Sequence, residues 1–486
     1  MNKAMVFKIT GIILQIESLL MLLPAVVSLF YLESKVALIF LACAAATATA
    51  GTLLRLIFRP KNSLIYSREG LVITALCWFL MSLFGALPFI ITGAIPNFFS
   101  AFFETVSGFT TTGASVLSGQ QLDALYNSNH GILFWRSFTH WIGGMGVLVF
   151  VTAVIPNMSD RSIHIIRAEM PGPIVGKLVP KVRGTSRMLY LIYILLTFTQ
   201  IIFLLCGGLD LFESSILSFG TAGTGGFAIK GDSIASYSPY VQWVITIFML
   251  IFGINFNLYY LCIIRRFKNA VKSEELWAYL SIFAVSTGII TVSVMNYFNG
   301  FSEALRHSAF QVSSIITTTG FSTYDFNVWP VLCKTLLVII MMIGSCAGST
   351  AGGFKVSRFV IIVKTIKKEF QRLIHPRSVR TIKFEGKALD TVTLHGVTAY
   401  LAIYVIVMLS VFLLISVDNM SIETNFSATV ACFNNIGPGL DGVGPISSYA
   451  DYSVFSKVIL SFAMLMGRLE IYPVLLALSV GTWTKK

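Results

Sequence analysis

The sequence predicts an all-α polytopic membrane protein, with two leading helices followed by four helix–loop–helix repeats in a pseudo-fourfold arrangement. First, 55% of the 486 residues are hydrophobic and 12% are charged, and apolar runs long enough to cross a bilayer recur along the chain. Second, basic residues gather in alternate loops. Third, four short segments resemble one another and share one glycine at the same offset. They are FTTTGA (109–114), AGTGGF (222–227), ITTTGF (316–321) and FNNIGP (433–438).

The net charge of +13 could point to nucleic acid, so its distribution along the chain decides its meaning. Lys and Arg cluster in alternate loops, whereas the intervening loops carry mainly Asp and Glu, which is the positive-inside pattern of a membrane protein. We therefore expect both termini and the basic loops to face the cytoplasm and contact anionic membrane lipid, with no nucleic acid partner. The basic clusters lie within residues 55–68, 161–187, 265–272 and 355–387.

The elements follow in order from the N-terminus. The first apolar run is longer than a signal-peptide core, so we expect a retained helix at 6–32 and a second helix at 36–58. Each later repeat contains a half-polar segment that cannot span the membrane, as in a re-entrant loop, before a long apolar helix. The short re-entrant helices are expected at 98–109, 211–222, 302–316 and 421–433. The divisions are the leading helices (1–69), repeat one with a cytoplasmic linker (70–187), repeat two (188–274), repeat three with an interrupted second helix and a linker (275–391), and repeat four (392–486).

The four re-entrant loops carry the residue types that a cation pore needs. A cation leaving water needs a ring of oxygens, and backbone carbonyls can supply it where glycine lets the backbone turn. Threonine hydroxyls can hold such turns by hydrogen bonds, and the negative C-terminal end of each short helix favours a cation. Asp123, Glu303, Asp325 and Asp441 would make the outer vestibule mildly negative. The predicted filter residues are Thr110, Thr111, Thr112 and Gly113; Gly223, Thr224, Gly225 and Gly226; Thr317, Thr318, Thr319 and Gly320; and Asn434, Asn435, Ile436 and Gly437.

Two features of the second helices need an explanation. In repeat three the helix begins near residue 331 but is interrupted by GSCAGSTAGG (344–353), whose small residues do not hold a helix well; close small-xxx-small helix packing is the alternative. In repeat four, Arg468 lies in an apolar run (458–478), where a charge needs a partner or water. It should face the pore, pair with Glu470 or snorkel to the surface. Arg136 and His140 are interpreted as structural polar contacts.

These segments resemble those of a known family. TTTGA, TGGF, TTTGF and NNIGPG, each between two membrane helices, are similar to the four filters of the Trk/Ktr/HKT superfamily of potassium transporters. The two leading helices and four further segments are similar to its TrkH/TrkG branch, and the resemblance covers essentially the whole chain. Gly223 departs from the pattern, because the family more often has Ser there, and this would loosen one wall of the filter. The further segments are AEMPGP (168–173), GSCAGSTAGGFK (344–355), HPR (375–377) and MGRLEIYP (466–473).

The resemblance implies a fold like four fused potassium-channel subunits, with potassium as the transported ion. It also implies a homodimer in the bacterial inner (plasma) membrane and a cytoplasmic TrkA-type nucleotide-binding regulatory subunit. The chain has no Walker A loop, so a nucleotide would act only through that partner, for which the basic cluster at 355–387 offers a docking surface. In this family the glycine-rich stretch forms an intramembrane loop that obstructs the pore. The implied gate residues are Gly344, Gly348, Ser349, Thr350, Gly352, Gly353, Lys355 and Arg468.

Two alternatives stay open. A symporter that couples potassium to protons or sodium would need an ionisable residue near the midplane, and Arg468 is the one that the sequence offers. An intramembrane hydrolase could use Ser345 or Ser349 as nucleophile, but no suitably placed His or Asp base accompanies them, so we expect that the chain is not an enzyme. Seven cysteines without CxxC spacing indicate neither disulfides nor a metal site. Each loop has one filter glycine, against two in the TVGYG signature, so we expect weaker ion discrimination.

Overall fold

A computed structural model describes residues 1–60, 66–146, 182–377 and 381–484. Over these residues the chain is helical apart from loops and one two-stranded hairpin. This architecture confirms the predicted all-α class. The segment AEMPGP (168–173) and most of the second basic cluster lie outside the described residues.

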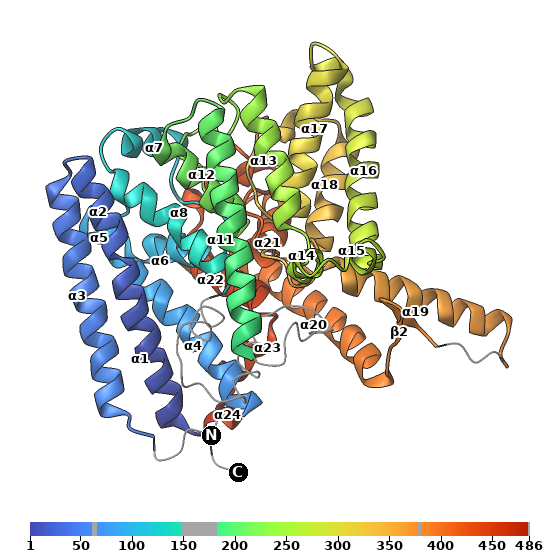
Figure 1. Ribbon diagram of the computed structural model, residues 1–486, viewed down its shortest axis with the longest axis horizontal. Coiled ribbons are helices and arrows are strands. Elements are labelled where there is room, and N and C mark those ends of the chain that lie inside the picture. The colour runs from blue at the N-terminus through green and yellow to red at the C-terminus, as the bar shows by residue number, and fades with distance from the viewer. Residues whose placement is uncertain (61–65, 147–181, 378–380, 485–486) are drawn as a thin grey trace.

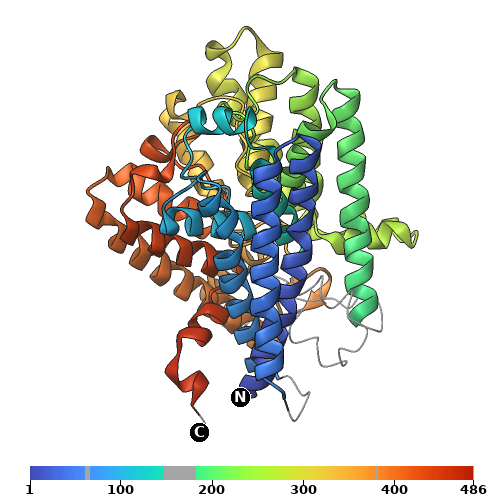
Figure 2. The ribbon, with the colours of Figure 1, turned by 90° about the vertical axis from the view of Figure 1, so that its left-hand side faces the viewer.

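The two leading helices form an antiparallel hairpin at one edge of the molecule (Figures 1 and 2). Its first arm is α1 (Lys3–Leu20) continued by α2 (Leu22–Phe30), and its second arm is α3 (Ser34–Ile57). The arms touch backbone to backbone where they cross: a Cβ on Gly11 would lie 2.6 Å from the carbonyl oxygen of Gly51, and the reverse distance is the same. The prediction of two leading helices is therefore confirmed.

Four repeats follow, each with a first helix, a short re-entrant helix and a second helix. The re-entrant helices are largely buried, because the rest of the fold surrounds their polar Ser and Thr side chains, as non-spanning backbone at membrane depth requires. The first helices are α4 (Ser67–Gly85) with α5 (Leu87–Ile91), α11 (Val182–Cys206), α16 (Glu274–Val294) and α20 (Thr391–Ile415). The re-entrant helices are α6 (Phe98–Phe109), α12 (Leu211–Gly223), α17 (Phe301–Ile316) and α21 (Ile422–Phe433). The second helices are α8 (His130–Gly144), α13 (Pro239–Phe252), α18 (Val331–Ile343) and α22 (Val454–Arg468).

Shorter elements connect or extend the repeats. Helices α14 (Phe256–Ile263) and α15 (Phe267–Val271) follow repeat two, and α23 (Tyr472–Leu478) and α24 (Val480–Trp483) follow repeat four, with α24 close to the chain ends (Figure 1). Repeat three continues into α19 (Val356–Ile374) and a hairpin of β1 (Lys383–Phe384) and β2 (Lys387–Ala388). Helix α7 (Gly119–Tyr126) and the 3₁₀ turns η2 (Met295–Tyr297), η3 (Phe326–Val328), η4 (Ser416–Asp418), η5 (Asp441–Val443) and η6 (Tyr449–Asp451) lie in loops.

The prediction of a long apolar helix after every loop is wrong. Among the described residues, six helices are long and apolar enough to cross a membrane: the two leading arms and the first helix of each repeat. The second helices have only 13 to 15 residues, or about 20 to 22 Å at 1.5 Å per residue, short of the roughly 30 Å hydrocarbon core. The chain bends by 89° between α13 and α14, and α22 ends at Arg468. An interruption was predicted in repeat three alone.

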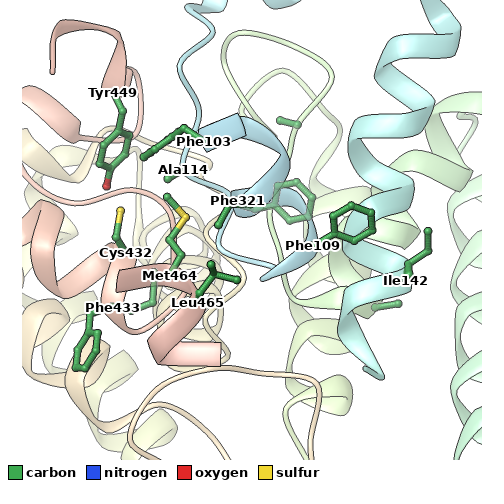
Figure 3. Packing of buried hydrophobic residues seen from close by; sticks show 14 of the residues in the cluster. Phe103, Phe109, Ala114, Ile142, Phe321, Cys432, Phe433, Tyr449, Met464 and Leu465 are labelled. Atoms are coloured by element: carbon green, nitrogen blue, oxygen red, sulfur yellow. The ribbon is translucent and has the colours of Figure 1, made fainter. Parts of the chain in front are cut away.

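Hydrophobic side chains of different repeats meet around the four loops. Figure 3 shows Phe103 and Ala114 of repeat one close to Tyr449 and Met464 of repeat four. The rings of Phe103 and Tyr449 lie 5.5 Å apart, and the Tyr449 hydroxyl donates to the carbonyl of Gly437 (2.7 Å). The apolar core therefore sets the positions of the polar loops at its centre.

Candidate functional site

Each re-entrant helix ends in the same hydrogen-bonded turn. In repeat one the N–H of Thr112 donates to the carbonyl of Ser107 (2.9 Å). The N–H of Thr111 donates to the carbonyl of Gly108 (3.1 Å), as in the Schellman motif that closes the free carbonyls of a helix end. The bond that spans five residues, like that from Thr112 to Ser107, recurs in the other three loops. It runs from Gly225 to Gly220 (2.8 Å), from Thr319 to Ser314 (2.8 Å) and from Ile436 to Ala431 (2.9 Å).

The turn points carbonyl groups away from the helix. A trans peptide holds its C=O opposite to its N–H, and the N–H of Thr112 points back to the helix, so the carbonyl of Thr111 points the other way. The turn requires a left-handed residue, which is uncommon for side chains other than Asn, Asp and Gly. The sequence analysis named these residues as filter residues but did not predict their left-handed backbone, since only the Asn carries a usual signal. They are Thr111, Thr224 and Thr318, each with φ +55°, and Asn435 with φ +56°.

The four predicted glycines form a closed ring. A Cβ on Gly113 would lie 1.9 Å from the carbonyl oxygen of Gly225 in the next loop, far below any real contact. Each glycine thus lies against the carbonyl oxygen of the residue that precedes the glycine of the next loop, and the fourth loop returns to the first. The other distances are 1.9 Å from Gly226 to Thr319, 2.0 Å from Gly320 to Ile436 and 2.7 Å from Gly437 to Thr112.

Hydrogen bonds hold the loops in unequal ways. As predicted for threonine, the hydroxyls of Thr110 and Thr112 bond to each other (2.8 Å), and the pair Thr317 and Thr319 repeats this contact (2.8 Å). The fourth loop uses an amide instead: Nδ2 of Asn435 donates to the Thr112 hydroxyl of the first loop (2.9 Å). Asn434 accepts a bond from the buried Tyr404 hydroxyl (2.9 Å).

Gly223 does not loosen the wall of the ring. It is the last residue of α12, and a Cβ there would lie 2.3 Å from the carbonyl oxygen of His140. Gly225 is equally crowded, because its Cβ would lie 2.3 Å from the His140 ring. Helix α8 therefore fills the space that a side chain at Gly223 would occupy, and the expectation of a looser wall is wrong.

Arg136 and His140 join the first two repeats, which confirms their interpretation as structural contacts. Arg136 donates to Glu104 (2.7 Å) and to the carbonyl of Ala228 (3.0 Å), and its guanidinium lies 3.5 Å from the centre of the Phe227 ring. Nε2 of His140 accepts from the N–H of Phe227 (3.3 Å), so Nδ1 carries the proton and donates to the carbonyl of Gly108 (2.7 Å). Sequence reasoning missed Glu104 as the partner of the buried arginine.

A cavity lies on each side of the ring. The outer cavity, about 600 Å³, is lined by Gly113, Gly226, Gly320 and Gly437 together with the residues that follow them. The inner cavity, about 660 Å³, is lined by the glycine-rich stretch, the end of α8 and Arg468. The ring is therefore reached from one side by the outer cavity, and the glycine-rich stretch lies on the other side.

The expected negative lining of the outer cavity is wrong. Among the described residues that line it, the charged side chains are Arg136 and Lys230, and the four carboxylates named above are absent. Asp123 instead accepts from the N–H of Gly231 (3.0 Å). Hydrogen bonds from Ser421 and then Thr424 lower the pKa of Asp441, which holds an outer turn.

Residues 344–355, the gate predicted from the sequence and hereafter called the gate loop, are not helical, so the small-xxx-small packing of two helices does not apply here. Gly344, Gly348 and Gly353 have φ of +74°, +71° and +77°. The loop lies directly under the ring: the N–H of Gly352 donates to the Thr318 hydroxyl (2.7 Å), and a Cβ on Gly352 would lie 2.6 Å from the carbonyl oxygen of Asn434.

The rest of the gate loop is tied to α13 and α14. The Thr350 hydroxyl donates to the carbonyl of Phe252 (3.3 Å), and the carbonyl of Gly348 accepts from the N–H of Phe256 (3.0 Å). The Ser349 hydroxyl donates to the backbone carbonyl of Cys346 (2.7 Å). Its hydrogen therefore points to the backbone and not to a catalytic base. Ser345 is buried beside it at 3.1 Å between the two hydroxyl oxygens.

Arg468 and Lys355 both bind backbone carbonyls of the gate loop. Arg468 donates to Thr350 (2.6 Å) and, from the opposite side of the inner cavity, to Gly143 (2.6 Å) and Gly144 (2.7 Å). Lys355 is 1% exposed and donates to the carbonyl of Ala351. Glu470, which the sequence suggested as a partner for Arg468, forms an ion pair with Arg358 (2.7 Å).

This arrangement defines a class of protein: a polytopic membrane protein with four re-entrant loops in a ring, open to a cavity on one side and covered by an internal loop on the other. Comparison with known proteins gives the family. The model of the TrkH family, described as cation transport protein, matches residues 37–283 and 275–482. The chain belongs to the TrkH family. It is therefore a transporter and not the intramembrane hydrolase considered above.

The relatives match over their full length. The Trk system potassium uptake protein TrkH of Escherichia coli K12 is 34% identical over 484 residues, covering 98% of each chain. TrkG of the same organism is 32% identical over 485 residues, covering 97% of each chain. A crystal structure of the potassium transporter TrkH from Vibrio parahaemolyticus superposes with a TM-score of 0.88 at 31% identity and covers 100% of both chains.

Proposed function

We propose that the protein takes up potassium ions through the ring of four loops, with the gate loop and Arg468 controlling the pathway beneath it. The observation that carries this proposal is the closed ring: four copies of one turn direct carbonyl oxygens away from their helices toward shared space, which suits a cation without its water shell. Potassium is favoured as the ion because the full-length relatives are named potassium uptake proteins.

The membrane is taken to be the bacterial inner membrane, with both termini cytoplasmic. The positive-inside distribution of Lys and Arg supports this orientation. The start of α1 and α24 lie at the same end of the molecule (Figure 1), as an arrangement with both termini on one side requires. The outer cavity then opens to the periplasm and the gate loop lies toward the cytoplasm.

Rubidium uptake into liposomes that contain the purified protein tests the proposal. We expect uptake that follows the rubidium gradient and needs no proton or sodium gradient. Strict dependence on one of those gradients would favour the symporter instead. Liposomes without protein are the control, and no uptake with the purified protein, alone or with its regulatory subunit, would contradict both transport mechanisms.

A homodimer and a TrkA-type nucleotide-binding subunit complete the proposal. The docking surface is narrower than the sequence suggested, because Lys355 and Arg358 are 1% and 4% exposed and cannot bind a partner. On α19, Lys367 and Arg372 are exposed and Lys368 is half-buried, and beyond the helix Arg377 and Lys387 are exposed too. A nucleotide acts in this scheme only through the partner subunit.

Reversal of Lys367, Lys368 and Arg372 to Glu is expected to abolish binding of the regulatory subunit, since the new negative charges would repel a partner that the positive charges attract. Basal rubidium flux is expected to stay unchanged. Size-exclusion chromatography with light scattering measures both the dimer and its complex. The matched control reverses Arg265, Arg266 and Lys268, an equal number of charges in another basic cluster. Complex formation by the α19 variant would remove this surface from the proposal.

A further inference from the structure

A two-stranded hairpin follows α19 and carries an unusual turn residue. β1 and β2 are joined by Glu385 and Gly386, with φ of +52° and +74°. Left-handed φ at both central positions defines a type I′ turn, for which Asn-Gly and Asp-Gly are the usual sequences. Glu adopts this left-handed conformation less readily than Asn or Asp. Its longer side chain is therefore explained by the groups that its carboxylate reaches.

The Glu385 carboxylate binds the beginning of α16. Its Oε1 accepts from the hydroxyl of Ser273 (2.8 Å), the N-cap residue of that helix, and from the N–H of Glu275 (3.1 Å). A carboxylate at a helix N-terminus is stabilised by the unpaired N–H groups and by the helix dipole. The hairpin therefore holds the first turn of α16 by two hydrogen bonds.

The same turn of α16 holds the gate loop. Glu275 is 5% exposed, and its Oε1 accepts from the N–H of Ala347 (2.7 Å). The neighbouring residues of the loop are fixed on the other side, since Cys346 donates its N–H to the carbonyl of Gly253 (3.2 Å). Glu275 is thus a point of attachment between a first helix and the gate loop.

The hairpin is also fastened to α19, which continues directly from the gate loop. Phe384 is buried with Ile361 and Val397 in a small hydrophobic cluster separate from the main core. Lys364 donates to the carbonyl of Lys383 (2.8 Å) and pairs with Glu274 at the start of α16. Figure 1 shows the beginning of α19 beside α15 and the lower end of α16, with β2 below α19. The hairpin is therefore attached both to α19 and to the first turn of α16.

A cavity of about 1040 Å³ lies between these parts. Its lining includes Ser273, Glu275, Ala347, Phe384 and Glu385. Both carboxylates and the attached loop residue thus border one open space between the hairpin and the gate loop.

We propose that Glu385 and Glu275 are positioning residues that link the cytoplasmic hairpin to the gate loop, so that a partner displacing the hairpin releases the loop at Ala347. This rests on the proposed role of residues 344–355 as a gate. The attachment differs from that made by Arg468, because it acts from the cytoplasmic side and through the first helix of repeat three.

Hydrogen exchange of the full-length protein in lipid nanodiscs tests the link without requiring transport. Glu385→Ala is expected to speed exchange of the Ala347 amide at least about fivefold and to raise basal rubidium flux, while exchange in α1 and α22 stays unchanged. Glu385→Gln keeps an acceptor oxygen and should restore most of the protection. Glu369→Ala, an exposed carboxylate on α19, is the matched control and should change neither readout.

Ser273→Ala removes one of the two hydrogen bonds to Glu385. It provides a second test if Glu385→Ala fails to fold. We expect hydrogen exchange at Ala347 to be accelerated less than in Glu385→Ala. Unchanged exchange at Ala347 in folded Glu385→Ala and Ser273→Ala overturns the link. If no variant, including the unmodified protein, transports rubidium, the proposed function fails, while the exchange at Ala347 still decides whether the hairpin holds the loop.

Discussion

Gly320→Ala is expected to lower rubidium uptake at least about tenfold and to reduce the preference for rubidium over sodium. The left-handed φ of +87° costs an alanine about 1–2 kcal/mol. The larger effect is a collision: the new Cβ would lie 2.0 Å from the carbonyl oxygen of Ile436, whereas carbon–oxygen contacts are normally about 3.3 Å or longer. The Cβ is held rigidly by its own backbone and its partner is a backbone oxygen, so only a separation of the two loops relieves the overlap, and this widens the ring.

Gly208→Ala is the matched control for this prediction. Gly208 has a φ of +86°, so alanine there meets the same backbone strain, but nothing lies within 4 Å of its Cβ. We expect uptake and ion preference close to those of the unmodified protein. Rubidium uptake with and without competing sodium measures both quantities. An equal loss in the two variants would trace the effect to backbone strain, and unchanged preference in Gly320→Ala would remove the loops from ion selection.

The sequence predicted the ring better than its surroundings, and the reason is physical. Repeated glycines mark positions where the backbone needs freedom, and the expected re-entrant helices at 98–109 and 421–433 agree with the structure to within one residue. The left-handed Thr111, Thr224 and Thr318 had no such signal, because threonine rarely adopts this conformation on its own. The conformation belongs to the helix-ending turn, whose bonds in repeat one run from Thr111 to Gly108 and from Thr112 to Ser107.

The lengths of the second helices were predicted least well. Hydropathy continues through residues 239–264 and 458–478, so the sequence suggested unbroken helices there. The breaks depend on tertiary contacts instead. At the first break, a Cβ on Gly253 would lie 2.6 Å from the Tyr279 hydroxyl of repeat three, and Asn255 then caps α14. At the second, Glu470 and Ile471 have φ of +62° and +66°, with Glu470 bound to Arg358.

Glu275 and Glu385 show a further limit of sequence reasoning. They are 110 residues apart in the sequence, and neither stands in a recognisable motif. Acidic residues near a helix start are usually read as caps or as solvent-exposed charge. Glu275 contacts the gate loop directly and Glu385 is connected to it only through the start of α16, so the link becomes visible only when α16, the hairpin and residues 344–355 are placed together.

Arg468→Ala is expected to raise basal rubidium flux about tenfold in the absence of any regulatory subunit. Arg468 bonds to Thr350 on the gate loop and to Gly143 and Gly144 at the end of α8, so it fastens the loop of repeat three to repeat one across the inner cavity. Hydrogen bonds from charged groups contribute about 1.5–3 kcal/mol each. A loss of about 1.4 kcal/mol from the closed state shifts a two-state equilibrium tenfold, and removal of the cation also lowers the barrier to potassium.

Arg468→Lys separates the two contributions. Lysine keeps the positive charge but lacks the planar fork that reaches carbonyls on two sides. Low flux in this variant would assign the main effect to the charge, whereas flux close to that of Arg468→Ala would assign it to the lost hydrogen bonds. Arg266→Ala, an exposed arginine outside the pathway, is the control. The gate assignment is wrong if folded Arg468→Ala has the same basal flux as the unmodified protein, because the hydrogen bonds of Arg468 would then not keep the pathway closed.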